Sequence, residues 1–100
     1  MLITSVAKGA FAGCESLNTI KMSKSIVSVG AGACAGLENL KEIVFLSKNK
    51  DGIKIGKGAF TGIADDAKFY GRASKAARQK TLKRIKKSGY KAIEEIIKIK

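Results

Sequence analysis

The sequence predicts an α+β repeat fold, a short solenoid of about three coils that is built from stacked short strands and closed by a C-terminal basic helix. Three observations support this prediction. The segment GAFAGCESLNTIKM at residues 9–22 returns as GACAGLENLKEIVF at residues 32–45 and, shortened, as GAFTGI at residues 58–63. Apolar residues alternate at the end of the two longer copies, as they do in a strand with one buried face. The last third of the chain is basic and helix-forming.

The copies define a register along the chain. One constant shift superposes the first copy on the second and places Ile20 on Ile43, and a slightly longer shift carries Ile43 to Phe69. The extra length of the second shift fits an exposed bend at SKNKDG, because an Asp-Gly pair signals a turn. Periods of roughly 20 to 29 residues with Leu-x-x-Ile-x-apolar spacing are typical of leucine-rich-repeat solenoids. The repeat region, residues 1–71, therefore divides into coils at about 2–24, 25–52 and 53–71, and a capping helix and short terminal strand follow at 72–100.

One strand of each coil is expected in LNTIKM and LKEIVF. Ile20 and Met22 in the first, then Ile43 and Phe45 in the second, alternate toward a buried face, and neighbouring coils pair the strands into a sheet. The opposite face of this sheet is a candidate binding surface. Its predicted residues are Asn18, Thr19, Lys21, Lys41, Glu42 and Val44.

The glycine-rich segments are expected to serve the backbone. Glycines such as Gly30 and Gly56 flank small alanines and allow stacked coils to approach closely. Phe11, Cys34 and Phe60 follow as inward-pointing side chains. The string VGAGACAG lacks the Lys-Ser/Thr ending of a phosphate-binding loop and recurs in each unit, so it predicts structure rather than an active site.

Together these motifs form one pattern: a β-branched residue and then Gly-x-Gly-Ala-Phe, a small residue and Gly-Cys-x-x-Leu-x-x-Ile. This pattern resembles the BspA-like leucine-rich repeats of bacterial cell-surface proteins, over about residues 3–71. The chain departs from the family at Ser23 and Leu46, where Pro usually follows the strand, at Cys34 in place of the second Phe, and at Asp66 in place of the third Leu.

The resemblance implies a non-catalytic protein-interaction module of a bacterial surface protein, with an extracellular or cell-surface location. Its function would be adhesion-type binding, and its partners would be host extracellular-matrix or cell-surface proteins, or acidic glycans. In the alternative, the coils are end-cap or stalk repeats of a larger surface protein, and the basic helix binds polyanions only non-specifically.

The C-terminal helix is expected in ASKAARQKTLKRIKKSGY, residues 73–90, which resembles the C-terminal cap of the family. Ser74 is the predicted N-cap and Gly89 ends the helix, while Ala77, Thr81 and Ile85 lie along one side. The remaining segment, KAIEEIIKIK, fits either a helical pair of charges or an alternating edge strand. The alternation of its last residues favours a short strand.

Positive charge is concentrated in this C-terminal part. Residues 68–100 hold 12 Lys or Arg and 2 Glu, whereas residues 1–67 hold 8 basic and 6 acidic residues, within a net charge of +12. Such a face is either a solvated cap or a site for acidic glycans, anionic polymers or acidic protein patches. Specific nucleic-acid readout is not expected, because no recognition motif or aromatic platform is apparent. The candidate polyanion-binding residues are Arg72, Lys75, Arg78, Lys80, Lys83, Arg84, Lys86 and Lys87.

The residue types argue against an enzyme and against a cofactor or metal. The chain has no histidine, the commonest general base, and Asp65-Asp66 lacks the ligand pattern of a calcium loop. Cys14 and Cys34 lack CxxC spacing and occupy apolar positions of the repeat, so both are expected to be buried fillers, with a disulfide or a reactive thiol as the alternative.

Met1 stands directly before a repeat that is already under way. The N-terminus lacks the pattern of a signal peptide, and no apolar run reaches the length of a membrane span. We therefore expect the chain to be a piece of a longer protein. An open first coil predicts either further coils upstream or self-association through this end.

Overall fold

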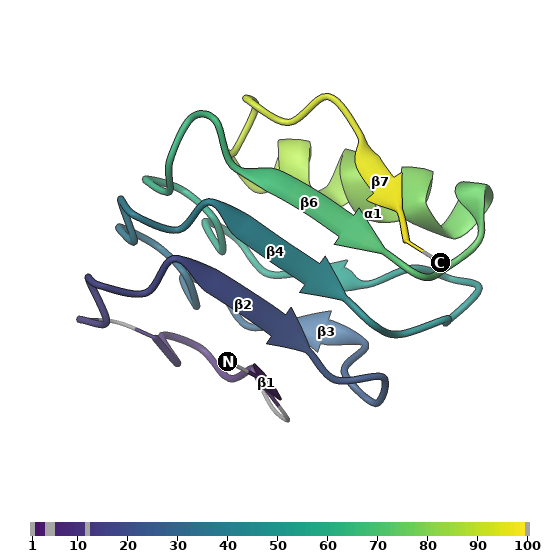
Figure 1. The fold of residues 1–100 in the computed structure, drawn as a ribbon, viewed down its shortest axis with the longest axis horizontal. Coiled ribbons are helices and arrows are strands. Elements are labelled where there is room, and N and C mark those ends of the chain that lie inside the picture. The colour runs from purple at the N-terminus through teal and green to yellow at the C-terminus, as the bar shows by residue number, and fades with distance from the viewer. Residues whose placement is uncertain (1, 4–5, 12, 100) are drawn as a thin grey trace.

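The main sheet of the molecule is parallel and takes one strand from each turn of the chain (Figure 1). The computed structural model describes residues 2–3, 6–11 and 13–99. In it, five strands pair in the order β1-β2-β4-β6-β7. They span Leu2–Ile3 (β1), Thr19–Met22 (β2), Glu42–Phe45 (β4), Lys68–Gly71 (β6) and Ile96–Lys98 (β7). Because strands far apart in the sequence lie side by side, the chain follows the course of a solenoid.

The strand pairing confirms the register that the repeats predict. Ile20 lies opposite Ile43, and Ile43 lies opposite Phe69, as the two shifts between the copies require. All three side chains are buried in the core. The sheet has five strands where about three coils were expected, because β1 and β7 extend it at its two edges.

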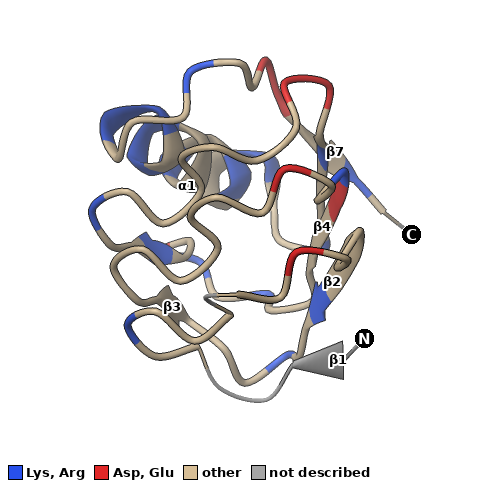
Figure 2. Cartoon of the chain, turned by 90° about the vertical axis from the view of Figure 1, so that its left-hand side faces the viewer, with Lys and Arg blue, Asp and Glu red and all other residues tan. Residues whose placement is uncertain are grey.

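A second, smaller sheet lies on the side of each coil opposite the main sheet (Figure 2). In it, β3 (Ser28–Val29) pairs in parallel with β5 (Lys54–Ile55), and Val29 lies opposite Ile55 in the register of the longer shift. Val29 is buried, so this sheet also contributes to the core.

The glycine-rich turns form a further ladder of hydrogen bonds between coils. The backbone N–H of Phe11 donates to the carbonyl of Ala33 at 3.0 Å, and the N–H of Cys34 donates to the carbonyl of Ala59 at 2.8 Å. Buried backbone groups must be paired, and here the partner of each turn is the equivalent turn of the next coil. The turns therefore fix the stacking distance as firmly as the strands do.

Two glycines are required by the contact between neighbouring coils. A Cβ atom at Gly30 would lie 2.4 Å from the carbonyl carbon of Ala7, and a Cβ atom at Gly56 would lie 2.4 Å from the amide nitrogen of Ala31. A methyl group cannot approach backbone atoms so closely. The repeat aligns Ala7 with Gly30, and the side chain of Ala7 is exposed because no coil of the described stack packs beneath it.

The core is filled by apolar side chains at repeated positions. Phe11, Cys34 and Phe60 point inward as expected and are buried. The ring centroids of Phe60 and Phe69 lie 5.3 Å apart in a T-shaped contact, a favourable geometry for aromatic pairs. These two rings belong to an aromatic cluster that consists of Phe45, Phe60, Phe69 and Tyr90.

Cys14 departs from the prediction of a buried filler. The repeat aligns it with Leu37 and Ile63, which are buried, but Cys14 is exposed. The first coil of the described stack packs against a neighbour on one side only, so the same position is left open there. The prediction is therefore right for Cys34 and wrong for Cys14, and both thiols are free.

The helix α1 (Lys75–Lys87) begins and ends where the sequence predicts. The hydroxyl of Ser74 accepts a hydrogen bond from the N–H of Ala77 at 3.3 Å, which caps the first turn. Gly89, with a φ of 122°, follows the C-cap Ser88 and turns the chain away. None of the residues that the structure describes belongs to a helix that is long and apolar enough to cross a membrane. The buried residues of α1 are Ala77, Thr81 and Ile85.

The helix lies against the last coil and is tied to it at its C-terminal end (Figure 1). The carbonyl of Ser88 accepts a hydrogen bond from the N–H of Gly58 at 2.9 Å, and the hydroxyl of Tyr90 donates to the carbonyl of Ala64 at 2.6 Å. The chain then returns to the main sheet as β7, parallel to β6. The segment after the helix thus contains the short edge strand that its alternation favours.

Replacing Gly56 with Ala is expected to lower the free energy of unfolding by about 2 kcal/mol or more, because the new methyl group meets the backbone of the neighbouring coil. Chemical denaturation measures this loss. The matched control is Ala7→Gly at the aligned, exposed position, which should cost less than about 1 kcal/mol. Equal losses in the two variants would contradict the contact.

Tyr90 makes part of the stability dependent on pH. Burial raises the pKa of the Tyr90 phenol above its ordinary value of 10.0, and the carboxylates of Asp65 and Asp66 raise it further. Because the folded-state pKa exceeds the unfolded-state pKa, this contribution is fully present below about pH 10 and is lost as the pH rises further.

Tyr90→Phe is therefore expected to cost about 1 kcal/mol at neutral pH, since the carbonyl of Ala64 loses its hydrogen bond. The difference between wild type and variant should shrink as the pH rises from about 8 to about 11. Urea unfolding at both pH values tests this, and a difference that stays constant would show that the phenol does not titrate with unfolding.

Candidate functional site

The outer face of the main sheet presents side chains in rows that cross the strands. Lys21, Val44, Tyr70 and Ile97 occupy one register position on four neighbouring strands. Lys21 is exposed, while Tyr70 and Ile97 are half-buried. This row and the half-buried residues beside it form what we call the outer-face patch, which consists of Lys21, Val44, Leu46, Tyr70, Ile97 and Ile99.

Val44 is less accessible than the sequence predicts. Only 6% of its surface is exposed, because Lys21 and Tyr70 flank it at the same register on the two adjacent strands. Val44 therefore lies beneath the surface of the patch, and the prediction that it is an exposed residue of the sheet face is wrong. The other predicted sheet-face residues are accessible: Asn18, Lys21, Lys41 and Glu42 are exposed, and Thr19 is half-buried.

Tyr70, Leu46, Ile97 and Ile99 are missing from the predicted sheet face. The longer of the two shifts between the copies relates Val44 to Tyr70 and could have found the tyrosine. The isoleucines could not be found in this way, because β7 returns after the helix and is no copy of the repeat. In the structure, residues of the predicted sheet face and residues missing from it lie around one shallow depression of about 290 Å³. Its lining residues are Lys21, Glu42, Val44, Leu46, Tyr70, Arg72 and Ile99.

Two of the eight predicted polyanion-binding residues are committed to the fold. The guanidinium of Arg78 donates to the carbonyl of Ile96 at 2.8 Å and to the carbonyl of Ala73 at 3.2 Å, so it joins α1 to β7. The guanidinium of Arg84 donates to the carbonyls of Asp51 and Ile53 at 2.8 and 3.1 Å, so it joins α1 to the bend before β5. Each of these arginines therefore uses part of its guanidinium to hold backbone carbonyls of another segment.

Lys80 has an acidic partner that the sequence does not reveal, since its amine lies 3.9 Å from a carboxylate oxygen of Asp51. Both groups are well exposed, and an ion pair of this kind contributes little. At the C-terminal end of the helix, a depression of about 440 Å³ is lined by Lys57 together with Arg84 and Lys87, two of the predicted residues. Apart from Arg78, Arg84 and Lys80, the predicted residues are all exposed: Arg72, Lys75, Lys83, Lys86 and Lys87.

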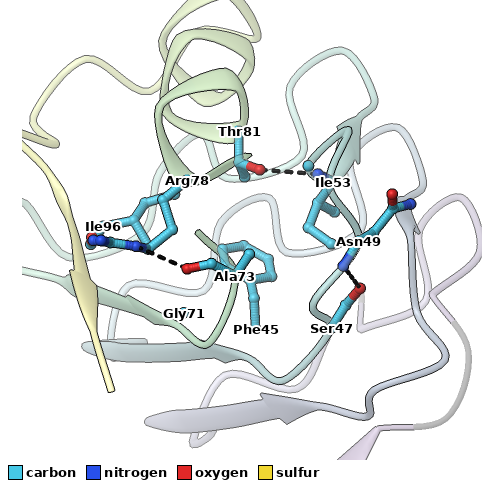
Figure 3. A pocket seen from close by; sticks show the side chains of 10 residues that line it. Phe45, Ser47, Asn49, Ile53, Gly71, Ala73, Arg78, Thr81 and Ile96 are labelled. Carbon is cyan, nitrogen blue, oxygen red and sulfur yellow. Dashed lines mark hydrogen bonds between the residues drawn. The ribbon is translucent and has the colours of Figure 1, made fainter. Parts of the chain in front are cut away.

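A small cavity lies under the helix (Figure 3). Thr81 spans its edge: its hydroxyl accepts from the N–H of Ile53 at 2.9 Å and donates to the carbonyl of Ala77 at 3.1 Å. The cavity measures about 10 Å³, the space of about one water molecule, so it cannot admit a substrate. Arg78 and Thr81 thus lock the helix onto the stack rather than form a reactive centre.

Reactive or metal-binding groups do not gather elsewhere in the described ranges. No cluster of three or more His, Cys, Asp or Glu residues that could hold a metal ion occurs among the residues 2–3, 6–11 and 13–99. Burial raises the pKa of the Cys34 thiol from 9.0 to about 12. The thiol therefore stays protonated and unreactive near neutral pH.

Most carboxylates of the chain lie toward one end of the main-sheet strands. Acidic residues stand in the segments before the strands of the main sheet: Glu15, Glu38, Asp65, Asp66, Glu94 and Glu95. Three basic residues follow the strands, Lys24, Lys48 and Arg72, while Lys41 and Lys91 precede them. Because the strands are parallel, the two sets collect at opposite ends of the strands.

The stacked parallel strands and repeated glycine turns agree with the comparison against known families. The family model of the BspA type leucine-rich repeat region (6 copies) matches residues 2–100. The chain belongs to the BspA-type leucine-rich-repeat family. Neither the search of curated proteins nor the search of solved structures gives a match.

BspA-type leucine-rich repeats generally form non-catalytic protein-interaction modules and typically occur in surface proteins. The chain is therefore a protein-interaction repeat module at the level of its family. Repeats of this kind bind through surfaces that many coils build together, not through a single pocket.

Arg84→Gln is expected to lower the free energy of unfolding by about 1 to 3 kcal/mol, because two carbonyls lose a charged hydrogen-bond donor. Lys83→Gln removes the same charge from the neighbouring, exposed residue and should change stability by less than about 0.5 kcal/mol. Thermal and urea unfolding of the pair provide the comparison. If both variants lose equal stability, net charge rather than the backbone contact governs the effect.

Proposed function

We propose that the chain is an adhesion-type binding module of a bacterial surface protein and that it binds macromolecules through the outer-face patch. The observation that carries this proposal is the position of Tyr70 between cations. Tyr70 is half-buried on β6, with Lys21 two strands away at the same register and Arg72 at the end of its own strand. Tyrosine and arginine are, with tryptophan, the residue types enriched among those that dominate binding energy at protein interfaces.

The rigidity of the patch supports the same proposal. Lys21, Val44, Tyr70 and Ile97 stand on paired strands, and the backbone N–H groups of Leu46 and Ile99, just after two of these strands, bond to the neighbouring strand. A side chain that is already ordered loses little conformational entropy when a partner binds. Ile97 and Leu46 add apolar area around the tyrosine, while charged residues form the rim.

The partners that this proposal implies are host extracellular-matrix or cell-surface proteins, and the proposed location is the cell surface or the extracellular space. The exposed lysines of α1 would assist by attracting acidic partners over a distance set by the ionic strength. The assistance is unspecific, because these lysines do not converge on one point.

A structural end piece is the second candidate. The observation that favours it is the placement of α1 over the last coil, where Ile85 of the helix is buried in the same core as Phe60. In this case the recognition surface lies elsewhere in a longer protein, and the helix charges serve solubility.

The test is binding to an immobilised panel of extracellular-matrix proteins and acidic glycans at about 0.15 M ionic strength. Tyr70→Ala should weaken binding to the protein that the wild type captures by roughly tenfold or more, because it removes the anchor of the patch. Lys54→Ala on β5 is the control on the other side of the molecule and should bind as the wild type does.

Both variants should first be shown to unfold at temperatures near that of the wild type, so that a loss of binding is not a loss of structure. If no protein on the panel binds at this ionic strength, or if Tyr70→Ala and Lys54→Ala bind equally well, the adhesion proposal fails and the structural end piece is favoured.

A further inference from the structure

A second surface lies around the corner from the outer-face patch, where the strands of the main sheet end. The loops after β2, β4 and β6 enclose an open cleft of about 570 Å³. We call it the strand-end cleft. Its lining residues are Lys24, Ser25, Val27, Leu46, Ser47, Lys48, Asn49 and Arg72.

Three successive turns of the chain each bring one cation to this cleft. Lys24 follows β2, Lys48 follows β4 and Arg72 follows β6, and all three are exposed. Adjacent strands lie about 4.8 Å apart, so the ends of β2 and β6, from which the first and last cation follow, are separated by about 10 Å. The cations therefore form a short row rather than a single point charge.

Among the described residues, none that lines the strand-end cleft is acidic. Most carboxylates of the chain stand at the opposite end of the main-sheet strands, before the strands begin. Asp51, which follows in the same bend as Lys48, lies near the amine of Lys80. The positive potential of the three cations is thus not cancelled by the lining residues around them.

The cleft also offers apolar surface and a hydrogen-bond donor. Val27 has 43% of its surface exposed and is the exposed large hydrophobic residue among those described, while Leu46 is half-buried. The side-chain oxygen of Asn49 accepts a hydrogen bond from the N–H of Asp51 at 3.0 Å. The side-chain NH₂ group of Asn49 therefore remains as a donor. The lining residues that the structure describes include no aromatic ring, so a nucleic-acid base or a sugar ring would find no stacking platform.

We propose that the strand-end cleft binds an extended acidic protein segment in which carboxylates flank an apolar side chain. In an extended chain, side chains two residues apart are separated by roughly 7 Å, a spacing that a row of flexible cations about 10 Å long can meet. Lys24, Lys48 and Arg72 pair with the carboxylates, and the apolar side chain covers Val27. The cleft shares Leu46 and Arg72 with the surface around the outer-face patch. Lys24, Lys48 and Val27 lie outside that patch, so variants at these three residues test the cleft alone.

The probe is a short fluorescein-labelled peptide that repeats Glu-Glu-Leu, and fluorescence polarisation measures its affinity at about 0.15 M ionic strength. The double variant Lys24→Gln/Lys48→Gln should weaken binding by roughly five- to tenfold, because it removes two of the three charge pairs. The matched control, Lys57→Gln/Lys87→Gln, loses the same charge beside the helix and should stay within about twofold of the wild type.

A second comparison isolates the apolar contact. Val27→Ser should weaken binding to the Glu-Glu-Leu peptide and leave binding to a Glu-Glu-Ser peptide unchanged. The proposal is overturned if the two double variants lose affinity equally, since binding is then a property of the net charge. It is also overturned if heparin or single-stranded DNA binds at this ionic strength while the peptide does not, because the occupant is then a polyanion of another class.

The outcome is separable from that of the adhesion experiment. Tyr70→Ala should leave peptide binding unchanged, and the Lys24→Gln/Lys48→Gln variant keeps Tyr70, Ile97 and Lys21. A failure of the peptide to bind overturns the cleft proposal and leaves the outer-face patch to its own test, and a failure of the matrix proteins to bind has no bearing on the cleft.

Discussion

The close contact of backbone with backbone between stacked coils is the constraint on which the rest of the structure depends. At Gly30 and Gly56 the contact leaves no room for a methyl group. The turns that follow exchange hydrogen bonds with the turns of the next coil. Once the coils lie at this distance, strand pairing, burial of the apolar plugs and the register of the outer face are all determined together.

This stacking also decides where function can reside. A parallel solenoid repeats every position of the coil at the same place, so a residue type that recurs in the repeat becomes a row on the surface. Glu15 and Glu38 recur in this way. The cations Lys24, Lys48 and Arg72 hold different positions of the repeat, and they gather at the other end of the strands because the strands are parallel. The interior is filled with apolar side chains, and the small cavity under the helix has no room for chemistry.

Much of this arrangement could be predicted from the sequence because it is periodic or local. The shifts between the copies determined the strand register, and Ser74 and Gly89 determined the limits of the helix. These features could be predicted because the residues that make the contacts also carry the pattern.

The remaining features depend on contacts between segments that share no repeat. Arg78 and Arg84 have the sequence pattern of a solvated basic face, but each donates to carbonyls on a segment distant in sequence. Periodicity states which positions are equivalent, and it does not state how many neighbours each of them has, which is why Val44 is covered and Cys14 is not.

Ala7 has a consequence for how such an array can grow. In the second and third coils the equivalent residue is glycine, and its missing side chain is what admits the coil before it. A duplicated coil inserted at the Gly30 or Gly56 junction would carry the same glycine, so its backbone could contact both neighbouring coils without a clash. The same coil packed beneath Ala7 would clash with its methyl group, so it would have to tilt or lie at a larger distance. Insertion of an identical coil is therefore compatible with the Gly30 and Gly56 junctions, whereas the methyl group of Ala7 is not compatible with a coil stacked at the same distance.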